Sequence, residues 1–349
     1  MFFPFFFIFS QGQVLGIDIG TKYCCITAFQ NGKVDIIAYK QLSTIISPTT
    51  QFVETGQKFT SLAKNDTSFD NFYARHHSYV EIQQHFSPEE IIIILRILKK
   101  IAEKHLGHEV RDTVITIPAY FNDFQRKSII NLGTLSGLNI IRLLYKPVSI
   151  AIAYDLNNLK YDMSKILIFD FGSTTLSVAL LENDFRYLDL LSFSDLQIGG
   201  DDINNCIFEY ISNKYQKKTG KNLTMTSKLS SDIERAKCEL SFSNETIIKI
   251  DEENFIETIT REQFEELNKD IFQKLLDPIK DILNDAKIEK NEIDKVVLAG
   301  GSSLIPQAQE IVQEYFHGKE ILKNINPKEV TSIGAATFGD ILVKIENEL

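Results

Sequence analysis

One stretch occurs twice in this chain and constrains its fold more than any other feature. Residues 166–178 read I-L-I-F-D-F-G-S-T-T-L-S-V, and residues 14–26 read V-L-G-I-D-I-G-T-K-Y-C-C-I. In each copy an apolar run leads into an aspartate, a glycine and small polar residues, and a second apolar run follows. This pattern predicts a β-hairpin with a carboxylate at its tip. Two copies about 150 residues apart indicate a duplicated domain rather than a short-period repeat.

The residues at each predicted tip have the chemistry of a phosphate site. Asp18 matches Asp170, and Gly20 matches Gly172. Glycine lets backbone N–H groups approach an anion closely. An aspartate repels phosphate, so its presence indicates a divalent cation or its water shell between the two, as Mg²⁺ is usually held. Two such hairpins facing each other would hold a polyphosphate and its metal from both sides, whereas either one alone is equally well explained as an ordinary turn.

Length and composition limit the classes of protein that need consideration. A chain of 349 residues exceeds what one hydrophobic core usually serves, so we expect two lobes. The formal net charge of −10, without a dense Lys/Arg cluster, argues against nucleic-acid binding. Four cysteines without C-x-x-C spacing favour free thiols over a disulfide or a metal site. Cys24 and Cys25 are adjacent on a predicted strand and therefore point to opposite faces.

The two ends of the sequence carry weak targeting signals. Phe2 to Phe9 is an apolar run too short to span a bilayer, so no stable membrane span is expected. Ser10 and Gly12 give a small-x-small cleavage pattern, which makes residues 1–12 a candidate signal peptide. The last four residues, E-N-E-L, loosely resemble the K-D-E-L retrieval signal. These signals favour the endoplasmic reticulum lumen, with the cytoplasm as the alternative.

Strands and long helices alternate along the chain, which predicts an α/β protein in two lobes with a cleft between them. We expect lobe I over 13–160, lobe II over 161–325 and a C-terminal helix over 326–349. A capping box at Ser87 with Pro88 after it begins one helix, and Gly107 ends it. After Thr260, apolar residues at helical spacing up to Ile282 predict one long amphipathic helix.

Several motifs, taken together, resemble the nucleotide-binding domain of the 70-kilodalton heat-shock (Hsp70) chaperones, over nearly the whole chain from Val14 to about Val343. The resemblance implies the two-lobed actin-like ATPase fold, which is a pair of ribonuclease-H-like domains with a nucleotide cleft between them. Actin and sugar kinases share similar hairpins, but P-A-Y-F-N-D and E-R-A-K point to the chaperone branch. Besides the two hairpins, the motifs are V-I-T-I-P-A-Y-F-N-D (114–123), I-G-G-D-D (198–202), E-R-A-K (234–237), L-A-G-G-S-S-L-I-P (298–306) and N-I-N-P-K-E-V-T-S-I-G-A-A (324–336).

The resemblance also implies a role for each matching residue. Asp18 and Asp170 would hold Mg²⁺ through water while a water molecule attacks the γ-phosphate of ATP, and Thr175 would stabilise the transferring group. The remaining residues would bind ATP or ADP: the first phosphate loop (Gly20, Thr21, Lys22, Tyr23), the second (Gly172, Ser173, Thr174, with Thr175), the residues near ribose and phosphates (Gly199, Gly200, Asp201), those beside the adenosine (Glu234, Lys237, Ser241) and those opposite them (Gly300, Gly301, Ser302), with Lys146 near the metal.

Several positions depart from the family pattern. Lys146 stands where the family has a glutamate, and Ser177 where it has an aspartate that helps to organise the attacking water and the metal. Lys146 would either neutralise phosphate directly and make the metal partly redundant, or point to solvent. The other departures are Ser173 and Thr174 for glycines, Cys238 and Leu304 for arginines near the adenine, Lys328 for an aspartate, and a first lobe shortened over 48–86, where Lys58, Lys64 or Arg75 could replace the family's catalytic lysine.

These departures leave two main functions open. The first is an Hsp70-like ATP-binding protein with weak ATP hydrolysis and without the family's peptide-binding domain, similar to the truncated stress-70 ATPase-core chaperone of the endoplasmic reticulum. The alternative is a pseudo-ATPase scaffold or regulator that binds chaperones or co-chaperones with little or no turnover. A sugar-kinase-like phosphotransferase is the least supported, because no sugar-binding insertion is evident. Besides the nucleotide, the expected partners are other chaperones, J-domain proteins and nucleotide-exchange factors.

Overall fold

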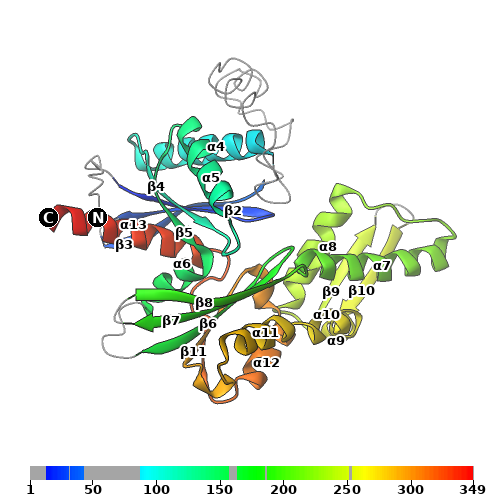
Figure 1. Cartoon of the computed structure of the whole chain (residues 1–349). Coiled ribbons are helices and arrows are strands. Elements are labelled where there is room, and N and C mark those ends of the chain that lie inside the picture. The colour runs from blue at the N-terminus through cyan, green and yellow to red at the C-terminus, as the bar shows by residue number, and fades with distance from the viewer. Residues whose placement is uncertain are drawn as a thin grey trace, which may run out of the picture. The chain divides into compact units, whose positions relative to one another are not determined.

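The computed structural model describes residues 13–30, 32–42, 87–156, 163–184, 187–250 and 254–348. The chain divides into two compact units, Met1–Leu156 with Glu329–Leu349, and Asn157–Lys328 (Figure 1). We call these unit 1 and unit 2 and describe each by itself. The candidate signal peptide, the shortened segment 48–86 and the three candidate basic residues within it lie outside the described residues.

Unit 1 contains a five-stranded mixed sheet in the order β3-β2-β1-β4-β5. Strands β1, β2 and β3 pair antiparallel, and β1, β4 and β5 pair parallel. The parallel strands are connected through helices, as parallel pairing requires. The strands are β1 (Leu15–Ile19), β2 (Tyr23–Gln30), β3 (Lys33–Gln41), β4 (Asp112–Ile117) and β5 (Asn139–Tyr145).

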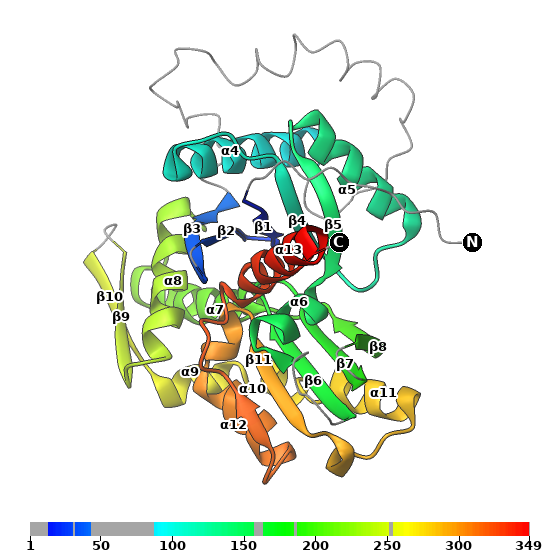
Figure 2. The ribbon, with the colours of Figure 1, turned by 90° about the vertical axis from the view of Figure 1, so that its left-hand side faces the viewer.

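Helices cover both faces of this sheet (Figure 2). On one face lie α4 (Pro88–Leu106) and α5 (Asp123–Leu135), and on the other lie α6 (Lys146–Ala153) and α13 (Val330–Glu348). Alternate residues of β1 divide between the two faces. Leu15, Ile17 and Ile19 join the core beneath α4. Gly16 faces α13 so closely that a Cβ there would lie 2.4 Å from the Ala336 nitrogen.

Unit 2 repeats the sheet of unit 1 strand for strand, in the order β8-β7-β6-β11-β12. Strands β6, β7 and β8 pair antiparallel, and β6, β11 and β12 pair parallel. This repetition confirms the predicted duplication and the α/β class of the actin-like ATPase fold. The strands are β6 (Ser164–Phe171), β7 (Leu176–Asp184), β8 (Tyr187–Leu196), β11 (Lys295–Ala299) and β12 (Glu320–Leu322).

The rest of unit 2 packs on one face of its sheet through a single large core. That core joins Leu167, Phe169 and Val178 of the strands to Ile207 of α7 and Ile233 of α8. The elements are α7 (Gly200–Thr219), α8 (Ser227–Leu240), the antiparallel pair β9 (Glu245–Ile250) and β10 (Phe255–Thr260), α9 (Arg261–Leu267), α10 (Lys269–Gln273), α11 (Asp277–Ala286), the 3-10 turns η3 (Lys290–Glu292) and η4 (Gly301–Leu304), and α12 (Pro306–Tyr315).

The prediction of one long helix after Thr260 is wrong, because three short helices, α9, α10 and α11, occupy this segment. The buried Asn268 side chain donates to the Phe264 carbonyl at 2.8 Å and ends α9. Pro278, which has no N–H to donate, stands near the start of α11. In the part of the chain that the structure describes, no helix is both long and apolar enough to cross a bilayer.

Candidate functional site

The first hairpin, β1 to β2, has the tight tip that its sequence predicts. Asp18 is the last but one residue of β1, and Gly20 follows the strand directly. The Gly20 N–H donates to the Tyr23 carbonyl at 2.9 Å. A Cβ at position 20 would lie 2.7 Å from the same carbonyl oxygen. The turn therefore requires glycine, and it leaves the backbone at the tip uncovered by a side chain at that position.

Asp18 forms an ion pair with Lys146. The ammonium of Lys146, the first residue of α6, lies 3.1 Å from Asp18 Oδ1 and donates to the Ile19 carbonyl at 3.4 Å. The Thr116 hydroxyl of β4 donates to the same Asp18 oxygen at 2.5 Å. The Lys146 side chain is 19% exposed and that of Asp18 is 16% exposed. Of the two orientations open for Lys146, the structure shows the one directed at the hairpin rather than at solvent.

The second hairpin, β6 to β7, repeats the geometry of the first. Asp170 is again the last but one residue of its strand, and the Gly172 N–H donates to the Thr175 carbonyl at 2.9 Å. The strand register also matches, because the residue opposite each aspartate is the seventh after it: Cys25 opposite Asp18, and Ser177 opposite Asp170. The two sequence copies therefore fold into the same local structure within their separate units.

The beginning of α7 is attached to the second hairpin by backbone hydrogen bonds. The Gly200 N–H donates to the Gly172 carbonyl at 3.1 Å, and the Asp201 N–H donates to the Ser173 carbonyl at 2.7 Å. A Cβ at Gly199 would lie 2.3 Å from the Ser173 carbonyl oxygen. The paired glycines therefore allow a helix N-terminus to approach the hairpin more closely than any side chain would permit.

The loop after β11 completes this cluster in unit 2. The Ser302 hydroxyl donates to the Gly172 carbonyl at 2.8 Å. Gly300 has a φ of 80°, and a Cβ there would lie 2.5 Å from Asp170 Oδ1. Gly301 faces the aliphatic chain of Lys328. The glycines of this loop thus allow backbone to pass directly beside the Asp170 carboxylate.

Helix α8 contributes a buried ion pair to the same cluster. Lys237 is 6% exposed, and its ammonium donates to the Gly200 carbonyl at 2.9 Å and contacts Glu234 Oε2 at 3.0 Å. Asn204 of α7 donates to the same carboxylate oxygen at 2.8 Å. At the C-cap that follows α8, the Ser241 hydroxyl donates to the Lys237 carbonyl at 3.4 Å. Cys238 lies on the same face of α8 as Glu234 and Lys237. Its pKa is raised, mainly by burial and secondly by the Glu234 carboxylate.

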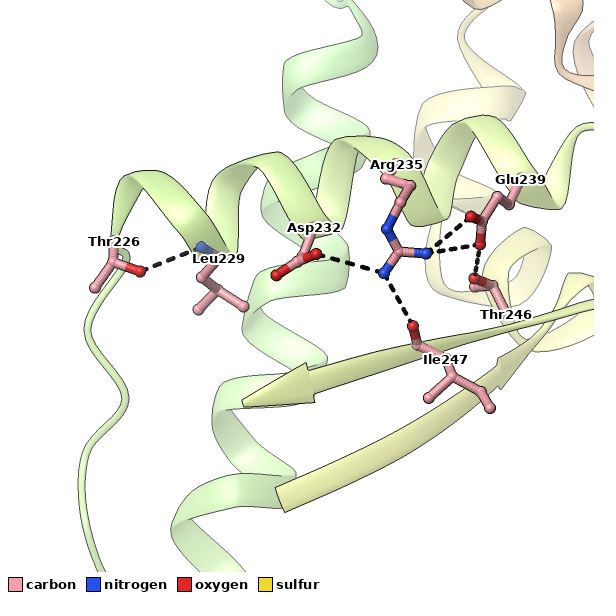
Figure 3. Close-up of polar contacts among 7 residues, drawn as sticks. All are labelled: Thr226, Leu229, Asp232, Arg235, Glu239, Thr246 and Ile247. Atoms are coloured by element: carbon pink, nitrogen blue, oxygen red, sulfur yellow. Dashed lines mark hydrogen bonds and ion pairs between the residues drawn. The ribbon is translucent and has the colours of Figure 1, made fainter. Parts of the chain in front are cut away.

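A second stripe of α8 fixes the helix on β9 (Figure 3). Arg235 donates to both carboxylate oxygens of Glu239, at 2.8 and 2.9 Å, and to the Ile247 carbonyl at 3.2 Å. Thr246 also donates to Glu239, and Thr226 caps the helix by accepting from the Leu229 N–H at 3.2 Å. Because adjacent helical positions point about 100° apart, this attachment leaves the stripe with Glu234 and Lys237 directed at α7.

The structure therefore brings the predicted residues together in two groups, one in each unit. Unit 1 holds Asp18, Lys146 and the first hairpin, and unit 2 holds the second hairpin with α7, α8 and the loop after β11. Whether the groups share one nucleotide stays a prediction, as do the roles of the individual residues. Sequence reasoning missed the side chains that hold these groups: Thr116, Asn204 and Asp195, which accepts a hydrogen bond from Ser177.

A comparison with known protein families agrees with the Hsp70 resemblance that the repeated sheet and the paired hairpins support. The model of the family described as Hsp70 protein matches residues 71–348, which is about four fifths of the chain. The match includes the second hairpin, the α7 and α8 motifs and the loop after β11. Because the family model matches most of the chain and the fold is duplicated as expected, the chain belongs to the Hsp70 family.

Proposed function

We propose that this Hsp70-family protein binds ATP and ADP through its two aspartate-tipped hairpins and hydrolyses ATP weakly. The observation that carries the proposal is the equivalence of the hairpins. Each places an aspartate before the end of its strand and a glycine N–H that donates at 2.9 Å across the tip. Backbone N–H groups and Thr or Ser hydroxyls at such tips are suitable donors for phosphate oxygens. The family match supports nucleotide binding in general.

Both hairpins carry oxygen donors that suit Mg²⁺, and the first hairpin also has a cation at its aspartate. Asp170 and the hydroxyl-rich turn 173–175 provide the carboxylate and oxygen ligands that Mg²⁺ prefers, directly or through water. At Asp18 the Lys146 ammonium already balances the carboxylate at 3.1 Å. When bound, Mg²⁺ would neutralise charge on the β- and γ-phosphates. We infer that Lys146 contributes part of that neutralisation, so that nucleotide binding depends less on Mg²⁺ than it would without this lysine.

A nucleotide-binding pseudoenzyme is the second candidate, and the Lys146–Asp18 ion pair also favours it. Phosphoryl transfer depends on positioned charge around the phosphates. A cation held against Asp18 and a serine at position 177 change that charge while leaving the hairpin backbones intact. Such a protein would signal its nucleotide state to other chaperones, J-domain proteins or exchange factors. Residence in the endoplasmic reticulum lumen remains a prediction from the terminal sequences.

Thermal unfolding with and without Mg·ATP, together with steady-state phosphate release, separates the two candidates. A ligand at 100 times its dissociation constant stabilises the folded state by about 2.7 kcal/mol. Asp170→Ala should reduce both signals, whereas Asp189→Ala, an exposed aspartate on β8 of the same sheet, should leave them unchanged. Stabilisation without phosphate release above that of Asp170→Ala would select the pseudoenzyme. No stabilisation by saturating nucleotide would refute both candidates.

A further inference from the structure

Three polar side chains form a row across the sheet of unit 2. Asp170 of β6 lies opposite Ser177 of β7, and Ser177 lies opposite Asp195 of β8. Directly opposite residues on antiparallel strands point to the same face, with Cβ atoms about 4.5–5.5 Å apart. The alternating residues Phe169 and Val178 belong to the core on the other face. The row therefore shares one face with Asp170, away from that core.

The direction of the hydrogen bond in this row has a chemical consequence. The Ser177 hydroxyl donates to Asp195 Oδ1. A serine hydroxyl has one proton and two lone pairs. Because the proton is committed to Asp195, Ser177 Oγ can act only as an acceptor toward groups on the Asp170 side. An acceptor there suits a water molecule, which donates hydrogen bonds, and not a phosphate oxygen, which accepts them.

A purely structural explanation of the pair meets a difficulty. Asp195 is half-buried, and within the described residues no basic side chain forms an ion pair with it. Burial raises its pKa, and the Ser177 hydrogen bond only partly opposes that rise. A half-buried carboxylate without a cation costs some stability, so an apolar residue at this position would hold the sheet together at least as well. A site function would explain why a carboxylate stands there.

We propose that Asp195 is a positioning residue that fixes Ser177 Oγ as a hydrogen-bond acceptor for water beside Asp170. The proposal rests on the function proposed above, because it places that water between Asp170 and the bound phosphates. Asp195 acts through Ser177 and not by direct contact with the nucleotide. Through its hydrogen bond with Ser177 of β7, the Asp195 carboxylate of β8 would thereby influence the water beside Asp170.

The test combines apo stability, the Mg²⁺ dependence of ATP affinity and phosphate release in Asp195→Leu. This variant removes the hydrogen-bond acceptor and the half-buried charge together. We expect a melting temperature equal to or above that of wild type, a gain in ATP affinity on adding Mg²⁺ reduced at least threefold, and phosphate release reduced about 10–100-fold, as for groups that orient ligands of a metal. Asp189→Leu, on the same strand but exposed, serves as the matched control.

A rescue variant distinguishes positioning from structure. Ser177→Asp in the Asp195→Leu background returns a carboxylate directly opposite Asp170, and we expect it to restore most of the Mg²⁺ effect and of the phosphate release. A lower melting temperature for Asp195→Leu with both nucleotide readouts unchanged would overturn the proposal and leave a structural pair. If wild type binds ATP without releasing phosphate, the Mg²⁺ effect alone decides. Wild type without any ATP-induced stabilisation would instead refute the proposed function, and this inference with it.

Discussion

Lys146 Nζ lies 3.1 Å from Asp18 Oδ1, so an ammonium is paired with the carboxylate at the tip of the first hairpin. Both side chains are half-buried, and their attraction is therefore stronger than that of a surface pair. The aspartate of the first hairpin, which resembles a metal ligand, is thus already paired with the Lys146 ammonium. The pair gives the carboxylate of the first hairpin a cation from within unit 1.

Replacing Lys146 with Met should make ATP binding more dependent on Mg²⁺, because the fixed cation beside Asp18 is lost. The free energy of unfolding should fall by about 1–2 kcal/mol, between the values for exposed and buried ion pairs. Urea unfolding, and calorimetric titration of ATP with and without a chelator, measure both effects. Lys99→Met is the matched control, because Lys99 is similarly half-buried and pairs with Glu103 on α4. Equal Mg²⁺ dependence in wild type and Lys146→Met would contradict this role.

Gly199→Ala should weaken ATP binding at least fivefold. Its Cβ would lie 2.3 Å from the Ser173 carbonyl oxygen, so α7 and the second hairpin must separate. Overpacking of this kind costs about 1–3 kcal/mol. Gly220→Ala is the control, since open space surrounds that position and only its φ of 73° is strained, at about 1–2 kcal/mol. If Gly199→Ala bound ATP like Gly220→Ala, the contact between α7 and the hairpin would have no part in binding.

Lys237→Met should destabilise unit 2 by about 2–4 kcal/mol, because the Glu234 carboxylate loses its buried cation and the Gly200 carbonyl loses its ammonium donor, while the Asn204 hydrogen bond to Glu234 remains. Glu234→Leu combined with Lys237→Met should recover part of this loss, since the half-buried negative charge is then removed together with its cation. A double-mutant cycle by urea unfolding measures the coupling. Strictly additive effects would show that the two side chains do not interact in solution.

Cys24 and Cys25 should make the protein less stable at high pH. Burial is the largest cause that raises the pKa of both thiols from the ordinary 9.0 to about 12. A pKa raised in the folded state means that the unfolded chain loses its thiol protons first. The thiols therefore stabilise the folded state fully below pH 9, and this contribution is lost as the pH rises from 9 to about 12.

The measurement for the two thiols is urea unfolding between pH 8 and 11, in wild type and in Cys24→Ala/Cys25→Ala. The stability of wild type should fall more steeply above pH 9, by up to about 1.4 kcal/mol per pH unit for each thiol. Parallel pH profiles in the two proteins would mean that the thiols are not buried. A thiol reagent at pH 8 should also label Cys206 and Cys238, which are half-buried, faster than the buried pair.

Local patterns predicted the hairpins because each signal lies within a dozen consecutive residues. Apolar alternation, a glycine and the register around Asp18 and Asp170 are sequence-local properties. The residues that contact Asp18 and Asp170, in contrast, can lie far away in the sequence. Thr116 is 98 positions from Asp18 and looks like any β-branched strand residue, so only the parallel pairing of β1 with β4 brings it to the carboxylate.

The same distinction explains the errors elsewhere in the chain. After Thr260 the apolar stripe is periodic, but the Asn268 side chain competes for a helix carbonyl and interrupts the helix. The direction of Lys146 depended on whether α6 begins beside β1, which no local pattern contains.

Calorimetric titration of ATP into wild type, Asp18→Ala and Asp170→Ala tests the shared use of the hairpins most directly, since the two aspartates belong to different units. We predict one ATP per chain, with the affinity of that single site reduced at least tenfold by either substitution. Two independent sites, or a loss confined to one of the two variants, would contradict a nucleotide held by both hairpins.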